Sequence, residues 1–178
     1  MRSEKLKVMS MIAITLISAA LAVVGMAVML KGNIPDSVSG LVYNLSATKQ
    51  WWWSVWLSAV AITVMVPLMV ALGDWAWLGW LTSVCLIGAA VTPVIRSDTR
   101  RMHNICGVAA GILSQLCVVV LCPWWLMCWF VFVPLMAGSM AAFNDSEDLP
   151  VVCAGKGVLV AECICAVSLY GALVTAIL

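Results

Sequence analysis

The residues best suited to chemistry lie in one short segment, RSDTRRMHNICG, which runs from residue 96 to residue 107. It holds three of the nine Lys and Arg residues of the 178-residue chain and its single histidine, His103. Histidine is the side chain best placed to exchange protons near neutral pH. His103 is therefore a candidate for proton transfer, with Asp98 as a nearby carboxylate, or for binding a polar head group. The alternative is a histidine that only hydrogen-bonds loop backbone.

A metal site is not expected from this composition. Zinc requires three or four protein ligands, whereas this chain offers one histidine, Cys106 on the same helical face, and dispersed acids. The eight cysteines lie mostly in apolar runs and form no CxxC pair. Buried cysteines of this kind usually behave as small hydrophobic residues. We predict no metal and no cofactor.

Glu162 is the acid that lies clearly inside an apolar run. A carboxylate in hydrocarbon is costly and usually faces a partner or a watery cavity. If it faces the interior of a helical bundle, it could meet His103 or an arginine from 96–101. The alternative is a shallow glutamate that reaches the interface. In a proton-coupled transporter, Glu162 and Gln115 would line the proton path through the bundle.

The elements that position these residues are transmembrane helices. Hydrophobic residues make up 65% of the chain, against roughly 45–50% in soluble proteins. Several runs approach the roughly 20 apolar residues needed to cross a bilayer, and in lipid such runs must be helical. We predict an all-α, polytopic transmembrane bundle forming a single domain, 1–178. Its six predicted spans are 8–30, 52–72, 75–95, 103–121, 124–142 and 157–178.

The two faces of this bundle are expected to differ. With six spans, both termini lie on the same side as the tight turns after the second and fourth spans. The other side receives the connections 31–51, 96–102 and 143–156. Connections of that length carry function more often than tight turns do, although they can also be plain connectors. Orientation stays open, because Lys and Arg before the first span favour a cytoplasmic N-terminus while the loop face carries more cations.

The ten tryptophans cluster near the predicted span ends. Amphipathic indole rings favour the membrane–water interfaces, which predicts an aromatic belt at both faces. The alternative is a tryptophan-lined groove for a lipid or ligand.

Two segments together resemble a known family. PDSVSGLVY (35–43) resembles the Ser-x-Ser motif of a bacterial six-span membrane protein family of unknown function, and GAAVTPVIRSDTRRMHNICG (88–107) resembles its later signature. That family is distantly similar to DRAM-like and FGF-receptor-activating-protein-like membrane proteins. The resemblance implies a polar cluster on the loop face and the inner (plasma) membrane of a bacterium. The cluster that it implies comprises Ser37, Ser39, Tyr43, Pro93 and His103.

We therefore predict an integral membrane protein that binds a lipid head group or small polar ligand on the loop face, because arginines pair well with phosphate oxygens. The predicted ligand-binding residues are Ser37, Ser39, Tyr43, Arg96, Arg100 and His103. One alternative is a lipid-modifying enzyme with His103 as acid or base and Glu162 or Asp98 assisting. Others are a structural or assembly subunit and a proton-coupled transporter. Membrane lipids are the expected partners, together with a membrane protein or a second copy; a net charge of +1 argues against nucleic acid.

Overall fold

The computed structural model describes residues 2–30, 35–92, 99–131 and 149–178 of the chain. Within these ranges the fold is all-α and contains no strand. Short 3-10 helices occur in the connections, and residues 127–131 are helical. The long helices are α1 (Arg2–Met29), α2 (Trp51–Leu72), α3 (Ala76–Val91), α4 (Arg100–Leu121) and α6 (Leu149–Ile177).

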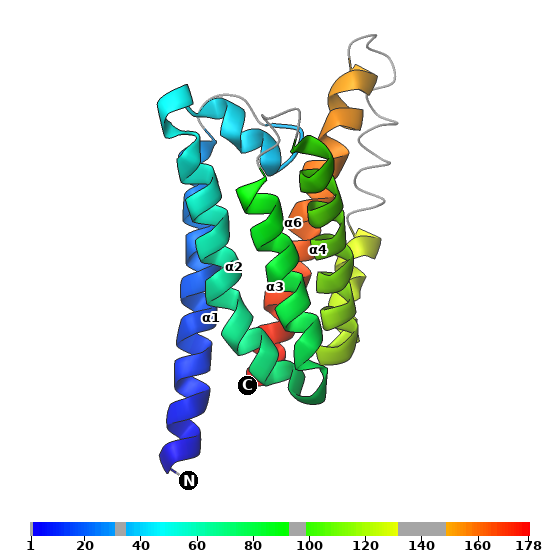
Figure 1. Cartoon of the computed structure of the whole chain (residues 1–178). Coiled ribbons are helices and arrows are strands. Elements are labelled where there is room, and N and C mark those ends of the chain that lie inside the picture. The colour runs from blue at the N-terminus through cyan, green and yellow to red at the C-terminus, as the bar shows by residue number, and fades with distance from the viewer. Residues whose placement is uncertain (1, 31–34, 93–98, 132–148) are drawn as a thin grey trace.

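Four helical stretches of the described residues are long and apolar enough to cross a membrane. They are Glu4–Met29, Ala47–Val91, Arg100–Leu121 and Gly157–Ile177. The second stretch contains both α2 and α3, which form a hairpin (Figure 1). Its turn falls at Gly73, whose φ of 56° lies in the left-handed region that glycine adopts without strain. The turn falls at the predicted boundary between residues 72 and 75, so α2 and α3 are separate helices.

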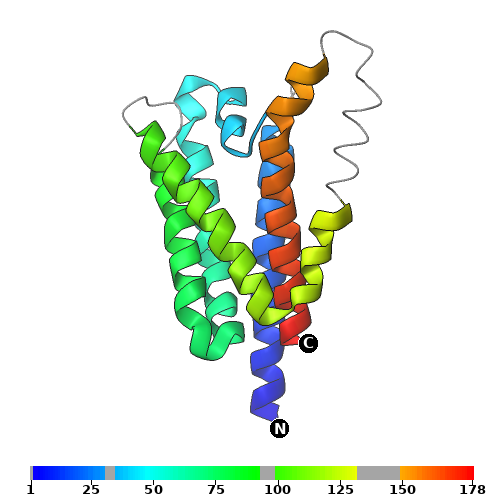
Figure 2. The same ribbon diagram turned by 90° about the vertical axis from the view of Figure 1, so that its right-hand side faces the viewer.

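The bundle has two unlike ends. We call the end that holds the end of α1, the start of α2, the end of α3 and the start of α4 the loop end; it is uppermost in Figure 1. The opposite end, with the Gly73 turn and the 3-10 helix η4 (Pro123–Leu126), is the turn end. The start of α1 and the end of α6 also lie at the turn end, as Figures 1 and 2 show.

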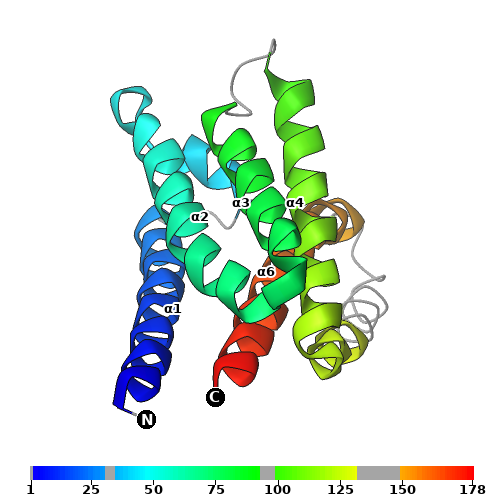
Figure 3. The ribbon, with the colours of Figure 1, turned by 60° about the horizontal axis from the view of Figure 1, so that its bottom comes forward.

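Two apolar clusters hold the helices together, one near each end. Toward the turn end, buried side chains of α2, α3, α4 and α6 meet around Leu68, Val118 and Leu173. At the loop end, α1, α2 and α3 close on the segment after α1, with Leu41 and Trp53 at the centre. Figure 3 shows α1 and α2 on one side of α3 and α4 on the other, with α6 passing behind α3. The loop-end cluster is the one that positions the candidate site.

Some tryptophans join helices to each other. The Trp56 indole of α2 crosses α1 at Gly25, where a Cβ would overlap the ring, and its Nε1 donates to the Leu21 carbonyl over 2.7 Å. The Trp125 ring packs on Gly171 in the same manner. The predicted aromatic belt therefore does not describe every tryptophan. The exposed ones are Trp51, Trp52, Trp75, Trp77, Trp80 and Trp124.

Polar groups in the bundle interior also link helices. Ser18 of α1 hydrogen-bonds to Tyr170 of α6 over 2.7 Å, and Thr63 of α2 donates to Ser18 over 2.9 Å. Gln115 of α4 accepts from Ser168 of α6 and from the Trp129 indole. Such bonds between transmembrane helices each contribute about 0.6 kcal/mol on average. The Gln115 side chain is thus engaged in helix association.

The observed helices match the predicted spans in order and differ in length. The first and last helices begin earlier than expected, α1 at Arg2 and α6 at Leu149. Beyond residue 131, the predicted span 124–142 lies outside the described residues. The connection after α1 forms two 3-10 helices, η1 (Ser39–Asn44) and η2 (Ala47–Lys49).

Candidate functional site

The segment 35–45 covers the loop end of α1, α2 and α3. Leu41 and Val42 on η1 are fully buried against the loop-end cluster, which anchors the segment by apolar packing. The Asn44 amide also donates to the Met29 carbonyl at the end of α1 over 3.1 Å. Ser39, the first residue of η1, is therefore held against the neighbouring helices.

Ser39 and His103 form a hydrogen-bonded pair. The Ser39 Oγ lies 2.7 Å from His103 Nε2, and His103 Nδ1 lies 2.9 Å from the Ala89 carbonyl oxygen at the end of α3. A carbonyl only accepts, so Nδ1 carries a proton; in the neutral ring, Nε2 then accepts from the serine hydroxyl. His103 is 4% exposed, so both bonds are protected from solvent.

The close approach of α3 and α4 places the imidazole. A Cβ at Gly88 would lie 2.9 Å from the Cys106 sulfur, so the glycine leaves the room that this contact needs. His103 stands one turn before Cys106 on α4, and Ala89 follows Gly88 on α3. The small residue at 88 thus brings the Ala89 carbonyl within reach of the histidine.

Trp53 of α2 forms the wall behind this pair. Its side chain is 1% exposed, and its ring centroid lies 5.8 Å from that of His103 in a tilted arrangement. Its Nε1 donates to the Val38 carbonyl oxygen over 3.2 Å. One indole therefore contacts the histidine and also holds the residue before Ser39.

Glu162 of α6 binds the same residue from the other side. Its Oε2 accepts the Val38 backbone N–H over 2.6 Å, and the nearby Leu159 N–H donates to the Asp36 carbonyl over 3.0 Å. The partner of the carboxylate is thus loop backbone; of the partners considered for an inward-facing Glu162, His103 bonds to Ser39 and Ala89 instead, and Arg96 lies outside the described residues. Among residues 35–92, 99–131 and 157–178, Glu162 makes no ion pair.

The other predicted site residues divide into three groups. Ser37 belongs to the segment, where its Oγ accepts the Gly40 N–H over 3.1 Å. Tyr43 is 62% exposed and Arg100 is also exposed, and neither contacts the Ser39–His103 pair. Arg96 and Asp98 lie outside the described residues. Ser37 and Ser39 thus lie in the segment 35–45, and His103 of α4 contacts this segment through Ser39. The side chains of Tyr43 and Arg100 lie at the surface.

The arrangement has the parts of an acid–base device. A hydroxyl, an imidazole within hydrogen-bond reach and a group that orients the imidazole are what an activated serine nucleophile requires. No group of three or more metal-ligating side chains occurs within the part of the chain that the structure describes. The chemistry that these residues can perform is therefore proton transfer and nucleophilic attack.

Sequence reasoning missed two contributors to this site. Trp53 lies in a run of three tryptophans that indicates an interface, and nothing in the run marks one ring as buried. The Ala89 carbonyl is backbone and leaves no trace in residue type. No protein family, curated protein or solved structure matches this sequence.

Proposed function

We propose that this chain is a six-span integral membrane protein that modifies lipids, with Ser39 as nucleophile and His103 as general base. The observation that carries the proposal is the 2.7 Å contact between Ser39 Oγ and His103 Nε2, with Nδ1 held by the Ala89 carbonyl. The pair lies at an end of apolar helices, where ester linkages of membrane lipids are within reach.

The proposed reaction is acyl transfer from a lipid ester. As Ser39 Oγ attacks the ester carbonyl carbon, its proton passes to His103 Nε2, and the same proton then goes to the departing alcohol oxygen. A water molecule or a second alcohol then attacks the carbonyl carbon of the acyl-serine and gives its proton to His103 Nε2. As the bond between the acyl group and Ser39 Oγ breaks, His103 returns this proton to Oγ, which restores the serine hydroxyl and the neutral imidazole. The Ala89 carbonyl stabilises the imidazolium that forms at each attack.

In this proposal, the predicted head-group site binds the head group of the lipid substrate. Arg100 and its neighbour Arg101 are exposed at the start of α4, at the same end as the pair. Guanidinium groups bind phosphate oxygens with paired hydrogen bonds, which suits a phospholipid head group. Arg96 is assigned to the same role by its place in the sequence.

A second candidate is binding of a lipid head group or small polar ligand without chemistry. The observation that favours it is the burial of His103, both of whose ring nitrogens already have protein partners. In this second candidate, the histidine fixes the position of the segment that a ligand contacts and takes no part in a reaction. The two candidates differ in whether the Ser39 hydroxyl reacts.

The test is labelling of the purified protein in lipid nanodiscs with a fluorophosphonate, which phosphonylates activated serines. We expect the label on Ser39, its loss in Ser39→Ala, and a rate at least about 100-fold lower in His103→Gln, the scale of general base catalysis. Ser46→Ala, at an exposed serine directly after this segment, is the matched control and should label normally. A folded wild-type protein that takes no label would exclude the enzyme proposal and favour ligand binding.

We also propose that the chain is related to the bacterial six-span family that it resembles. With this we propose that it is located in a bacterial inner membrane. What supports both is that Ser39 and His103, one from each resembling segment, contact each other. The proposed partners are membrane lipids, a membrane protein or a second copy of the chain.

A further inference from the structure

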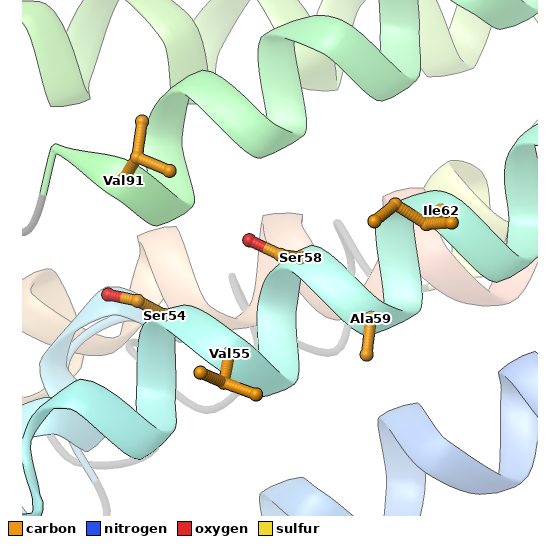
Figure 4. Close-up of a pocket in the computed structure, with 6 residues that line it drawn as sticks. All are labelled: Ser54, Val55, Ser58, Ala59, Ile62 and Val91. Carbon is orange, nitrogen blue, oxygen red and sulfur yellow. The ribbon is translucent and has the colours of Figure 1, made fainter.

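A groove lies between α2 and α3 toward the loop end, with a volume of about 430 Å³. That size is within the range of small-molecule sites, roughly 300–1,000 Å³. Figure 4 shows two serines of α2 directed toward the side on which the last turn of α3 lies. Its lining residues are Ser54, Val55, Ser58, Ala59 and Ile62 of α2 and Val91 of α3.

The walls of this groove suit hydrocarbon. Val55, Ile62 and Val91 are exposed, so the groove opens sideways from the bundle. It lies within the stretch Ala47–Val91, which is long and apolar enough to cross a membrane. If this stretch crosses a membrane, lipid acyl chains are the most concentrated ligand around the groove.

The two serines add a specific polar feature. Ser54 and Ser58 stand one helical turn apart, so their hydroxyls lie on one face of α2. Neither hydroxyl has a hydrogen-bond partner within the described ranges 35–92, 99–131 and 157–178. A hydroxyl donor in an apolar setting gains free energy from an acceptor. An ester carbonyl at the top of an acyl chain supplies an acceptor with no competing donor.

The groove lies on the two helices that supply Trp53 and Ala89 to the Ser39–His103 site, and near the same ends of these helices. Ser54 follows Trp53, whose ring contacts His103, and Val91 lies two residues beyond Ala89, whose carbonyl holds His103. From Ser54 to Ile62 the groove runs down α2 for about 12 Å, at 1.5 Å per residue. A chain lying there would place its ester at the level of the loop end.

We propose that this groove binds a glycerophospholipid from the surrounding leaflet, with an ester carbonyl on Ser54 and Ser58 and the upper acyl chain against Val55, Ile62 and Val91. The lipid held there is the substrate class presented to Ser39, and this part of the inference rests on the proposed function.

The experiment uses phosphatidylcholine vesicles that contain a phosphatidylcholine with a diazirine near the ester end of one acyl chain. After illumination, we expect cross-links in wild-type protein to concentrate on residues 54–62 and on Val91. Ser58→Trp fills the groove and should lower these cross-links at least fivefold. Val70→Trp, which adds the same bulk at an exposed site of α2 outside the groove, should leave them unchanged.

A second variant guards against misfolding of Ser58→Trp. Ser54→Ala with Ser58→Ala removes only the two hydroxyls, and it should lower cross-linking at the groove at least twofold. Cross-links that are equal around Val70 and in the groove, or that persist in both folded serine variants, would overturn the inference.

Fluorophosphonate labelling separates this inference from the proposed function. Label on Ser39 with unchanged cross-links in the variants would overturn the groove and leave the enzyme proposal standing. Cross-links that depend on Ser58, without label on Ser39, would support a lipid site and exclude the enzyme.

Discussion

Val38 is the residue through which three parts of the chain meet, namely α2, α6 and the segment 35–45. Its N–H is bound by Glu162 of α6, and its carbonyl accepts from the Trp53 indole of α2 and from the Leu41 N–H within the segment. Ser39 follows directly, so both of these side chains fix where the hydroxyl lies relative to His103. Glu162 acts on the pair only through this backbone, which makes it a positioning residue.

Replacement of Glu162 tests this role. In Glu162→Ala the partly buried Val38 N–H loses its acceptor, which we expect to cost about 1–3 kcal/mol in the free energy of unfolding. In Glu162→Gln the amide oxygen can still accept, so the loss should be smaller. The measurement is thermal unfolding in detergent micelles, together with the rate of fluorophosphonate labelling at Ser39.

The labelling rate distinguishes positioning from stability alone. It should fall in Glu162→Ala at temperatures where the protein is still folded, and it should recover most of its value in Glu162→Gln. Glu4→Ala, at an exposed carboxylate near the start of α1, is the control and should change neither quantity. Equal labelling rates of Ser39 in Glu162→Ala and in the wild type would show that Glu162 does not position Ser39.

At this scale the sequence predicted part of the site. Chemical type singled out His103, the lone histidine of an apolar chain, and Ser39 was expected beside it only because of the family resemblance. Chemical type also marked Glu162, but not its partner, since any residue can supply a backbone N–H. Arg100 and Tyr43 were expected in the cluster on grounds of charge and resemblance, and the fold places their side chains at the surface.

Among the helices, glycine decides how closely two elements approach. Trp56 lies across Gly25 and hydrogen-bonds to α1, which is possible only without a Cβ at that position. Gly107 and Gly111 of α4 have a GxxxG spacing that indicates close packing, yet a Cβ at either would meet nothing within 4 Å in the described part of the chain. The spacing alone therefore does not identify the contact.

Alanine substitutions at these glycines should have opposite effects. Gly25→Ala must displace the Trp56 ring from α1, and we expect it to destabilise the fold by about 1–3 kcal/mol, as overpacking does. Gly111→Ala should be neutral or stabilise by up to about 1 kcal/mol, because alanine favours helix. Denaturant unfolding in mixed micelles measures both; destabilisation by Gly111→Ala that equals the effect of Gly25→Ala would contradict the packing argument.

The helices themselves were predictable, whereas their facing sides were not. Long apolar runs and the tight turns predicted after the second and fourth spans placed the ends of α2 and α4 within a few residues. The buried residues of α2, such as Trp53, Leu57, Val60 and Val64, do recur with helical spacing. Exposed positions of α2 such as Val55, Ile62 and Val66 are as apolar as the buried ones, so hydrophobicity alone does not identify the inner face.

The asymmetry of the whole bundle follows from its chain path. Figure 2 shows α4 running from the loop end to the turn end, and α6 also running from the loop end to the turn end. The 22 residues of α4 span about 33 Å at 1.5 Å per residue, close to the thickness of a bilayer core. The chain between α4 and α6 must therefore return across that distance, which supports the proposed six spans with the predicted span 124–142 as the returning one.

Reporter fusions test this topology in a bacterial host. Alkaline phosphatase, which is active only after export, is joined after Asp74, after Cys122 and after Leu178, all expected at the turn end, and after Lys49 at the loop end. We expect the first three fusions to agree and the fourth to differ, because each successive span reverses the side of the membrane. A Leu178 fusion that agrees with Lys49 and differs from Cys122 would mean an odd number of crossings after α4. That result would put the two termini on opposite sides and remove the fifth span, while leaving the contact between Ser39 and His103 at the loop end intact.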